Sequence, residues 1–164
     1  MKLSREVQAS NLNLSVERLD QLHLPLVNKF YKACRYSAKA GRTDVVFVVR
    51  LQAESAHQPI IAALRLQLQQ SNIALVGASP SYFLRSMCVA PEYRRQGVGL
   101  FLLQELRPFL QDHSCYCYPF AHLQSFYSSI GFALRDPSTA PAHMVEAFMR
   151  YRRQGRDIVL MSRD

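Results

Sequence analysis

A short stretch rich in glycine and arginine stands where a predicted strand gives way to a predicted helix. It reads Arg94-Arg-Gln-Gly-Val-Gly99. Glycines at such a turn let backbone N–H groups approach a ligand without obstruction from side chains. The exposed amides and the positive dipole end of a helix N-terminus favour an anion, and two adjoining guanidinium groups add charged donors. The stretch therefore favours a phosphate or pyrophosphate ligand.

The residues after this stretch exclude two familiar kinds of phosphate loop. A P-loop requires Gly-Lys-Ser/Thr, whereas Gly99 is followed by Leu100 and Phe101. A dinucleotide-binding fingerprint requires a third glycine at the position where Leu102 stands. Taken alone, the stretch leaves one alternative open, an ordinary turn whose glycines bind no ligand.

The segment Val89–Leu103 resembles motif A of the GCN5-related N-acetyltransferases (GNATs). The family signature, Arg/Gln-x-x-Gly-x-Gly/Ala, matches Arg94, Gly97 and Gly99 in order. A second segment, Phe126-Tyr-Ser-Ser-Ile-Gly-Phe132, resembles the FYxxxGF segment of the same family and lies at the expected distance downstream. Two motifs in this order are far more specific than either one alone.

The resemblance covers Val45 to Phe132 and implies acetyl-CoA as cosubstrate. It implies that the pyrophosphate lies on the backbone amides of residues 95–100 and that the pantetheine arm pairs with the strand ending at Val89. A polyamide arm needs unpaired strand edges, and the family provides them by splaying that strand from the one at Cys115–Tyr118. The implied cofactor-binding residues are Met87, Cys88, Val89, Arg94, Arg95, Gln96, Gly97, Val98, Gly99 and Leu100.

Acyl transfer to an amine needs a polarised thioester carbonyl and a protonated leaving thiol. The resemblance implies that a backbone N–H near Val89 polarises the carbonyl and that Tyr127 is the catalytic residue, a general acid that protonates the thiolate. In the alternative reading, Tyr127 only packs beside Phe126. No general base is evident, because Arg85 stands on the strand where many family members carry Glu. We therefore expect a water chain or a backbone carbonyl to take the proton.

The four cysteines are expected to be reduced and mostly buried. They include no CxxC pair and no zinc-ligand spacing, so no metal is expected. Cys115 and Cys117 are too close in sequence to bridge comfortably. Cys88 could in principle carry an acyl group, but no histidine lies nearby in the sequence to activate it. We expect a structural thiol at this position and, as in the family, direct transfer within a ternary complex.

Charge gives the main indication of the acceptor and of other partners. The 164 residues carry a net charge of +8, with a pI near 9.6, which favours anionic partners. The resemblance implies an acceptor site built from the first helix, the loop after it and the late strand connections, and the cations there point to an amine acceptor, a small molecule or peptide, that bears a carboxylate or phosphate. The alternative is a solvated helix face. The residues concerned are Tyr31, Lys32, Arg35, Tyr36, Lys39 and Arg42.

Two other functions stay open on the sequence, namely CoA binding without acetyl transfer and nucleic-acid binding by a basic module. The second is disfavoured because the eight tyrosines and nine phenylalanines fall mainly in apolar patterns rather than between arginines. No apolar stretch approaches the ~20 residues that span a bilayer, and residues 1–11 show no signal-peptide pattern. We expect a cytoplasmic protein without membrane contact, and a homodimer is left open.

Hydrophobic periodicity predicts a mixed α/β domain of residues 1–164. The resemblance implies a GNAT fold, a mostly antiparallel mixed sheet with a splayed parallel strand pair around a βαβ unit, flanked by helices. A loop is expected at residues 69–80. Strands are expected at Leu12–Val16, Val45–Val49, Ile60–Leu68, Tyr82–Val89, Ser114–Tyr118, Phe132–Leu134 and Asp157–Met161, and helices at Gln21–Lys39, Val98–Gln111, Leu123–Ile130 and Pro141–Gln154.

Overall fold

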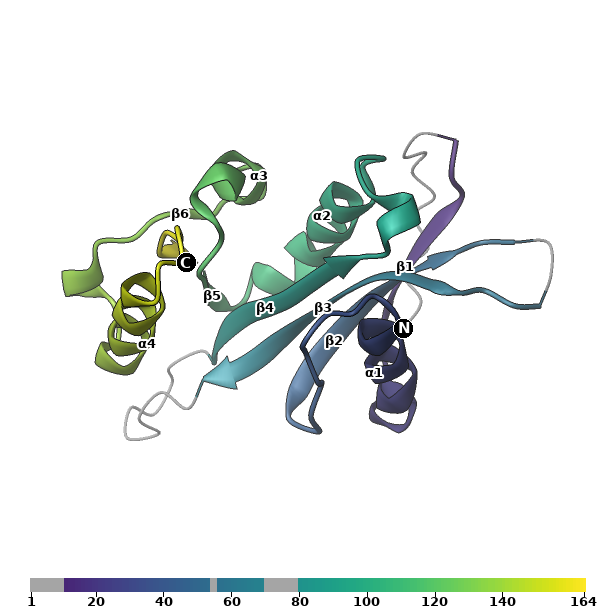
Figure 1. Cartoon of the computed structure of the whole chain (residues 1–164), viewed down its shortest axis with the longest axis horizontal. Coiled ribbons are helices and arrows are strands. Elements are labelled where there is room, and N and C mark those ends of the chain that lie inside the picture. The colour runs from purple at the N-terminus through teal and green to yellow at the C-terminus, as the bar shows by residue number, and fades with distance from the viewer. Residues whose placement is uncertain (1–10, 54–55, 70–79) are drawn as a thin grey trace. The chain divides into compact units, whose positions relative to one another are not determined.

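The computed structural model describes residues 11–53, 56–69 and 80–164 and divides into two compact units. The first unit consists of Met1–Leu68 and Leu84–Arg107, and the second of Gln69–Phe83 and Pro108–Asp164. Most of the predicted loop, and the N-terminal residues where no signal peptide was expected, lie outside the described residues. Strands and helices alternate along the chain (Figure 1), which confirms the predicted mixed α/β class.

The first unit is built on antiparallel strands in the order β1-β2-β3-β4. β1 pairs with β2, and β2 pairs with β3, in both cases antiparallel. The β-branched residues of β2 suit a buried strand, and Val48 has no exposed surface. The bounds of these strands are Leu14–Arg18 for β1, Asp44–Leu51 for β2, Ile60–Gln69 for β3 and Ser81–Val89 for β4.

Helix α1 (Leu24–Ala33) covers one face of these strands (Figure 1). A short 3-10 turn, η1 (Gln21–His23), precedes it, and the carboxylate of Asp20 caps that turn by accepting a 2.8 Å hydrogen bond from the Leu22 N–H. Pro25 lies in the first turn of α1, where it is tolerated. Buried side chains of the helix pack with the inward residues of the strands in a core cluster of Val27, Phe30, Tyr31, Val46, Val48, Ala63 and Cys88.

The prediction that the first helix extends to Lys39 is wrong, because α1 ends at Ala33. Arg35 takes the left-handed conformation (φ +53°), so the chain turns back on itself. The amide side chain of Asn28 then holds the returning segment, since it accepts from the Ala40 N–H at 2.8 Å and donates to the Ala40 carbonyl at 3.3 Å. The helix thus ends in a left-handed turn, in which the Tyr36 N–H donates to the Tyr31 carbonyl at 2.9 Å, and Asn28 holds the chain that follows.

The second unit holds strands in the order β4-β5-β7-β6. The first residues of β4, Ser81–Phe83, pair in parallel with β5 (Ser114–Cys117). β7 (Met161–Arg163) is antiparallel to both β5 and β6 (Ala133–Leu134). The helices and 3-10 turns of this unit are η3 (Ala121–Leu123), α3 (Gln124–Ser128), η4 (Pro137–Thr139) and α4 (Ala142–Arg153).

The prediction of a last strand at Asp157–Met161 is wrong, because the observed strand β7 starts only at Met161. Ile158 and Leu160 are buried as the pattern indicates, but they pack in a cluster with Phe148. Ile158 forms only an isolated bridge with Phe120. Ladder pairing begins at Met161, which lies opposite the last residues of β5 and β6, Cys117 and Leu134.

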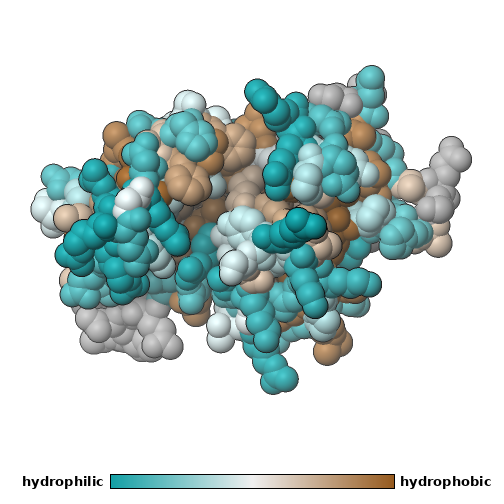
Figure 2. All heavy atoms as spheres, in the orientation of Figure 1, coloured by the Kyte–Doolittle hydropathy of each residue, from teal (hydrophilic) through white to brown (hydrophobic). Residues whose placement is uncertain are grey.

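Two elements run from one unit into the other, β4 and helix α2 (Val98–Leu110). Hydrophilic side chains spread over much of the face seen in Figure 2. No described helix is long and apolar enough to cross a membrane.

Candidate functional site

The predicted anion loop lies between β4 and α2 and contains two residues in the left-handed backbone conformation. A 3-10 turn, η2 (Pro91–Tyr93), leads into it. Arg95 has φ +59° and Gly97 has φ +80°. Such alternation turns successive backbone N–H groups toward one side and forms a concavity that suits an anion. A positive φ is uncommon for a residue other than glycine, so Arg95 is a distinctive feature of this loop.

Contacts to the neighbouring elements hold the loop in place. The guanidinium Nε of Arg94 donates to the carbonyl of Val89 at 2.9 Å, and the amide of Gln96 donates to the carbonyl of Glu92 at 2.9 Å. The helix starts with Val98, whose side chain is buried. The loop is thus tied to the end of β4 at one side and anchored in the core at the other.

The ten predicted cofactor-binding residues all belong to the first unit. They occupy the end of β4, the loop, and the first turn of α2. Arg94, Arg95 and Gly97 are exposed, so two arginines and a glycine lie at the surface just before the start of α2. This donor set fits a phosphate-bearing ligand.

Cys88, near the end of β4, has a packed side chain rather than a reactive thiol. Cys88 is only 4% exposed and belongs to the core cluster under α1. Burial, reinforced by the neighbouring Cys34 thiol, raises the pKa of Cys88 to about 12, although the Arg94 guanidinium works against this shift. The thiol is therefore protonated at neutral pH and is a poor nucleophile.

The strand carries one feature that the sequence did not indicate, a left-handed residue at Ser86 (φ +58°). The hydroxyl of Tyr31 donates to the Ser86 carbonyl at 2.8 Å. Arg65 donates from Nε to the Ser86 hydroxyl at 2.9 Å and pairs with Asp44 at 2.8 Å. No spacing or composition signal in the sequence connects these four residues.

The residues predicted to bind the acceptor differ in their exposure to solvent. Tyr31 is completely buried, whereas Lys32, Arg35, Lys39 and Arg42 are exposed. Burial raises the pKa of Tyr36, and so does nearby Cys88.

One arginine of β4 lies close to Tyr36. The Arg85 and Arg65 guanidinium groups both act to lower the pKa of Tyr36, against the larger effect of burial. Arg85 also donates to the side-chain oxygen of Gln67 on β3 at 3.0 Å. A polar patch that includes Arg85 therefore lies beside Ser86.

Tyr127 belongs to the second unit, in helix α3. It is 7% exposed, and its ring stands edge-on to the rings of Phe126 and Phe132, with centroids 5.3 Å and 6.0 Å away. Gly131 (φ +98°) follows the helix and turns the chain toward Phe132. This packing suits either reading of Tyr127, a held general acid or a packed aromatic.

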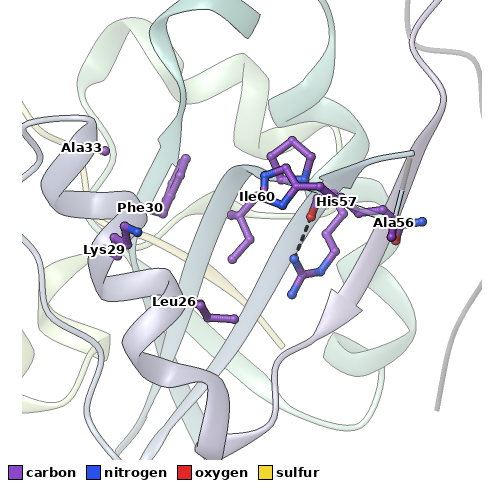
Figure 3. Close-up of a pocket in the computed structure, with 10 residues that line it drawn as sticks. Leu26, Lys29, Phe30, Ala33, Ala56, His57 and Ile60 are labelled. Carbon is purple, nitrogen blue, oxygen red and sulfur yellow. Dashed lines mark hydrogen bonds between the residues drawn. The ribbon is translucent and has the colours of Figure 1, made fainter. Parts of the chain in front are cut away.

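A cavity of about 630 Å³ opens between α1 and the segment that enters β3 (Figure 3). Leu26 and Phe30 form an apolar wall on the helix side, with Lys29 beside them, and Ile60 and His57 lie opposite. A smaller cavity of about 210 Å³ shares Phe30 and Ile60 and extends to residues 90–93. Neither cavity is lined by any of the ten predicted cofactor-binding residues.

Within the described residues, no group of three or more His, Cys, Asp or Glu side chains is arranged to hold a metal ion.

Comparison with known protein families gives one match, to the acetyltransferase (GNAT) domain, over residues 43–134. The matched region spans more than half of the chain and includes β4, the anion loop and α3. No curated protein sequence matches the chain.

Solved structures share the fold at low sequence identity. Arabidopsis thaliana Naa50, in complex with a bisubstrate analogue of CoA, has a TM-score of 0.61 at 12% identity, covering 92% of this chain and 98% of that one. A Mycobacterium tuberculosis protein in complex with CoA has 0.58 at 14%, covering 90% and 97%. The Escherichia coli ribosomal-protein-S18-alanine N-acetyltransferase has 0.54 at 17%, covering 92% of each chain. At such identities the likeness shows the fold, and it confirms the expected GNAT fold.

Proposed function

The chain belongs to the GNAT acetyltransferase family, and we propose that it moves an acetyl group from acetyl-CoA to a primary amine by direct transfer in a ternary complex. The acceptor would be a small molecule or a peptide. The observation that carries the proposal is the loop between β4 and α2, with its left-handed Arg95 and Gly97 and its exposed guanidinium groups.

The proposal assigns the pyrophosphate of acetyl-CoA to this loop. Accessible amides at residues 95–100 and the start of α2 would donate to phosphate oxygens, and Arg94 and Arg95 would add positive charge. The hydrogen bond from Arg94 to the Val89 carbonyl supports this assignment, because it fixes the side chain over the end of β4.

The pantetheine arm would bind along the backbone of Met87, Cys88 and Val89. The thioester of acetyl-CoA supplies the acyl group, and a backbone N–H near Val89 would polarise its carbonyl without any side chain. Cys88 takes no covalent part in this proposal, in keeping with its burial and its high pKa. Splaying of β4 from β5 stays a prediction.

Tyr127 is proposed as the general acid that protonates the leaving thiolate. Its support is the match of Phe126–Phe132 to the family segment and its fixed packing between two aromatic rings. No carboxylate is proposed as general base, since Arg85 stands where many members of the family carry Glu. Water or a backbone carbonyl would take the proton of the amine.

We propose that residues 1–164 act as one N-acetyltransferase domain, since β4 and α2 each contribute to both compact units. An acidic group on the acceptor, a cytoplasmic location and a homodimer stay predictions. Nucleic acid and membranes are not among the proposed partners.

Calorimetric titration with acetyl-CoA tests the proposal. The parent should bind, and Gly99→Glu should abolish binding while the protein stays folded, because it places bulk and a like charge at the anion site. Gln104→Glu is the matched control, since it adds the same charge at an exposed position further along α2. Undiminished binding by Gly99→Glu would remove this loop as the cofactor site.

A second measurement separates transfer from binding alone. Release of free CoA thiol is followed while a panel of primary amines is offered together with acetyl-CoA. Thiol release that depends on an amine supports transfer. Tight binding with no release for any amine would instead support a CoA-binding protein without transferase activity.

A further inference from the structure

Ser86 lies inside strand β4 but has the backbone conformation of a turn. Its φ of +58° is in the left-handed region, which residues other than glycine rarely adopt. A residue in this conformation breaks the regular pleat of a strand and redirects the backbone beyond it. Burial along β4 shows the break, because Leu84 and Cys88 are buried while residues 85–87 between them are all partly exposed.

The carbonyl of Ser86 is held by a tyrosine that has no exposed surface. The Tyr31 hydroxyl donates to it at 2.8 Å, from a position 55 residues earlier in the chain. Burial raises the pKa of Tyr31, so the hydroxyl remains a proton donor at any physiological pH. The Ser86 carbonyl can only accept a hydrogen bond, so the protonated Tyr31 hydroxyl is a suitable partner for it at any physiological pH.

The side chain of Ser86 is held from a different strand. Arg65 on β3 donates to the Ser86 hydroxyl at 2.9 Å. A second nitrogen of the same guanidinium pairs with Asp44 at 2.8 Å, and the Asp44 side chain, 4% exposed, also accepts from the Gly41 N–H at 2.9 Å. The Arg65 guanidinium is therefore bound on one side by Asp44 and on the other by the Ser86 hydroxyl, whose position it fixes.

These contacts act directly upstream of the backbone proposed to bind the pantetheine arm. Ser86 immediately precedes Met87–Val89, so its conformation sets the direction of their N–H and C=O groups. We propose that Tyr31 is a positioning residue for the acyl-CoA site: with Arg65, it holds Ser86 in the left-handed conformation and thereby fixes the backbone of Met87–Val89. The part of this inference that concerns acetyl-CoA rests on the proposed function. The part that concerns the backbone of Met87–Val89 does not.

The chain offers a matched control in Tyr36. The centroid of its ring lies 5.7 Å from that of Tyr31. Tyr31 belongs to helix α1, and Tyr36 lies just after the end of this helix. It is 39% exposed, and its hydroxyl makes no hydrogen bond to Ser86 in the part of the chain that the structure describes. Tyr31→Phe and Tyr36→Phe therefore remove the same group from neighbouring rings, but only the first removes the bond to β4.

The test has two readouts, hydrogen exchange of the ligand-free protein and acetyl-CoA affinity by calorimetry. Tyr31→Phe should accelerate amide exchange at Ser86–Val89 roughly tenfold and weaken acetyl-CoA binding by a similar factor, as expected for one lost buried hydrogen bond. Exchange in β1 and β2 should change less, and Tyr36→Phe should leave the exchange at Ser86–Val89 and the affinity for acetyl-CoA unchanged. Ser86→Ala is a milder second variant, which removes only the hydroxyl that Arg65 binds and should shift both readouts in the same direction.

A glycine background distinguishes positioning from general support of the fold. Glycine adopts positive φ without strain, so Tyr31→Phe should cost less acetyl-CoA affinity in a Ser86→Gly protein than in a Ser86→Ala protein. Equal losses in the two backgrounds would overturn the proposal.

Two exchange results would also overturn it, unchanged exchange at Ser86–Val89 or a uniform rise over the whole chain. Failure of the parent to bind acetyl-CoA would overturn the proposed function instead, and the exchange result would still decide whether Tyr31 fixes this backbone.

Discussion

Cys88 should react very slowly with a thiol-specific reagent although it lies in the strand proposed to bind acetyl-CoA. The thiolate is the reactive form of cysteine, and the surroundings of Cys88 disfavour it. The side chain is 4% exposed, and burial together with Cys34 raises its pKa from an ordinary 9.0 to about 12. Alkylation of the folded protein by iodoacetamide at pH 8 measures this directly.

The expected slowing follows from the thiolate fraction of Cys88. With a pKa of about 12, about one thiol in 10⁴ is ionised at pH 8, against about one in ten at 9.0. The rate at Cys88 should therefore be at least about 10³-fold below that of the same residue in the denatured chain. Restricted access to a buried sulfur slows the reaction further, so this factor is a lower bound.

Mass spectrometry of peptides after timed exposure gives the rate at Cys88, and the chain denatured in urea supplies the reference. Modification in the folded protein within tenfold of that reference would refute the reasoning. It would also reopen a covalent acyl-enzyme, which the proposed direct transfer excludes. Cys88→Ala should accordingly retain acetyl transfer.

The raised pKa of Cys88 also determines the direction in which the free energy of unfolding changes with pH. The folded chain holds the Cys88 proton more tightly than the unfolded chain, so between pH 9 and about 12 the folded state binds more protons. The contribution of this group to the free energy of unfolding is fully present below pH 9 and is lost as the pH rises toward 12. Cys88→Ala should remove this part of the alkaline decline in urea denaturation.

Three other changes test separate parts of the site. Arg94→Gln or Arg95→Gln should weaken acetyl-CoA binding in calorimetry, most strongly at low salt, where exposed charges are least screened. If both variants bind with the parent's affinity at every salt concentration, the two arginines are solvated surface residues without a role in binding. Tyr127→Phe should lower kcat at least tenfold with little change in acetyl-CoA affinity; steady-state kinetics that show an unchanged kcat would leave Tyr127 a packing residue. Asp44→Ala should cost about 3 kcal/mol of unfolding free energy in urea titrations, because it leaves the guanidinium of Arg65 buried without its 2.8 Å partner; a loss below 1 kcal/mol would show that the pair is effectively solvated.

Elements governed by near neighbours could be predicted from the sequence. The β-branched run at residues 45–49 predicted β2, and leucines at helical spacing predicted α2 to within one residue of its observed end at Leu110. The position of the anion loop followed from the same local signals, since glycines and arginines stand between a strand pattern and a helix pattern. Such features depend on residues a few positions apart, and the sequence displays those spacings directly.

Tertiary contacts decided what local patterns could not. After helix α1 the chain reverses at the left-handed Arg35, and Asn28 bonds to Ala40 across this reversal; β7 begins at Met161, opposite the last residues of β5 and β6.

The left-handed Ser86 depends on Tyr31, 55 residues away, and on the buried pair of Arg65 with Asp44. Nothing in a strand's own alternation marks such a residue, because its conformation is imposed by donors from other elements. The sequence therefore determined the fold class and the anion loop, whereas folding alone brought together the side chains that shape the backbone of β4.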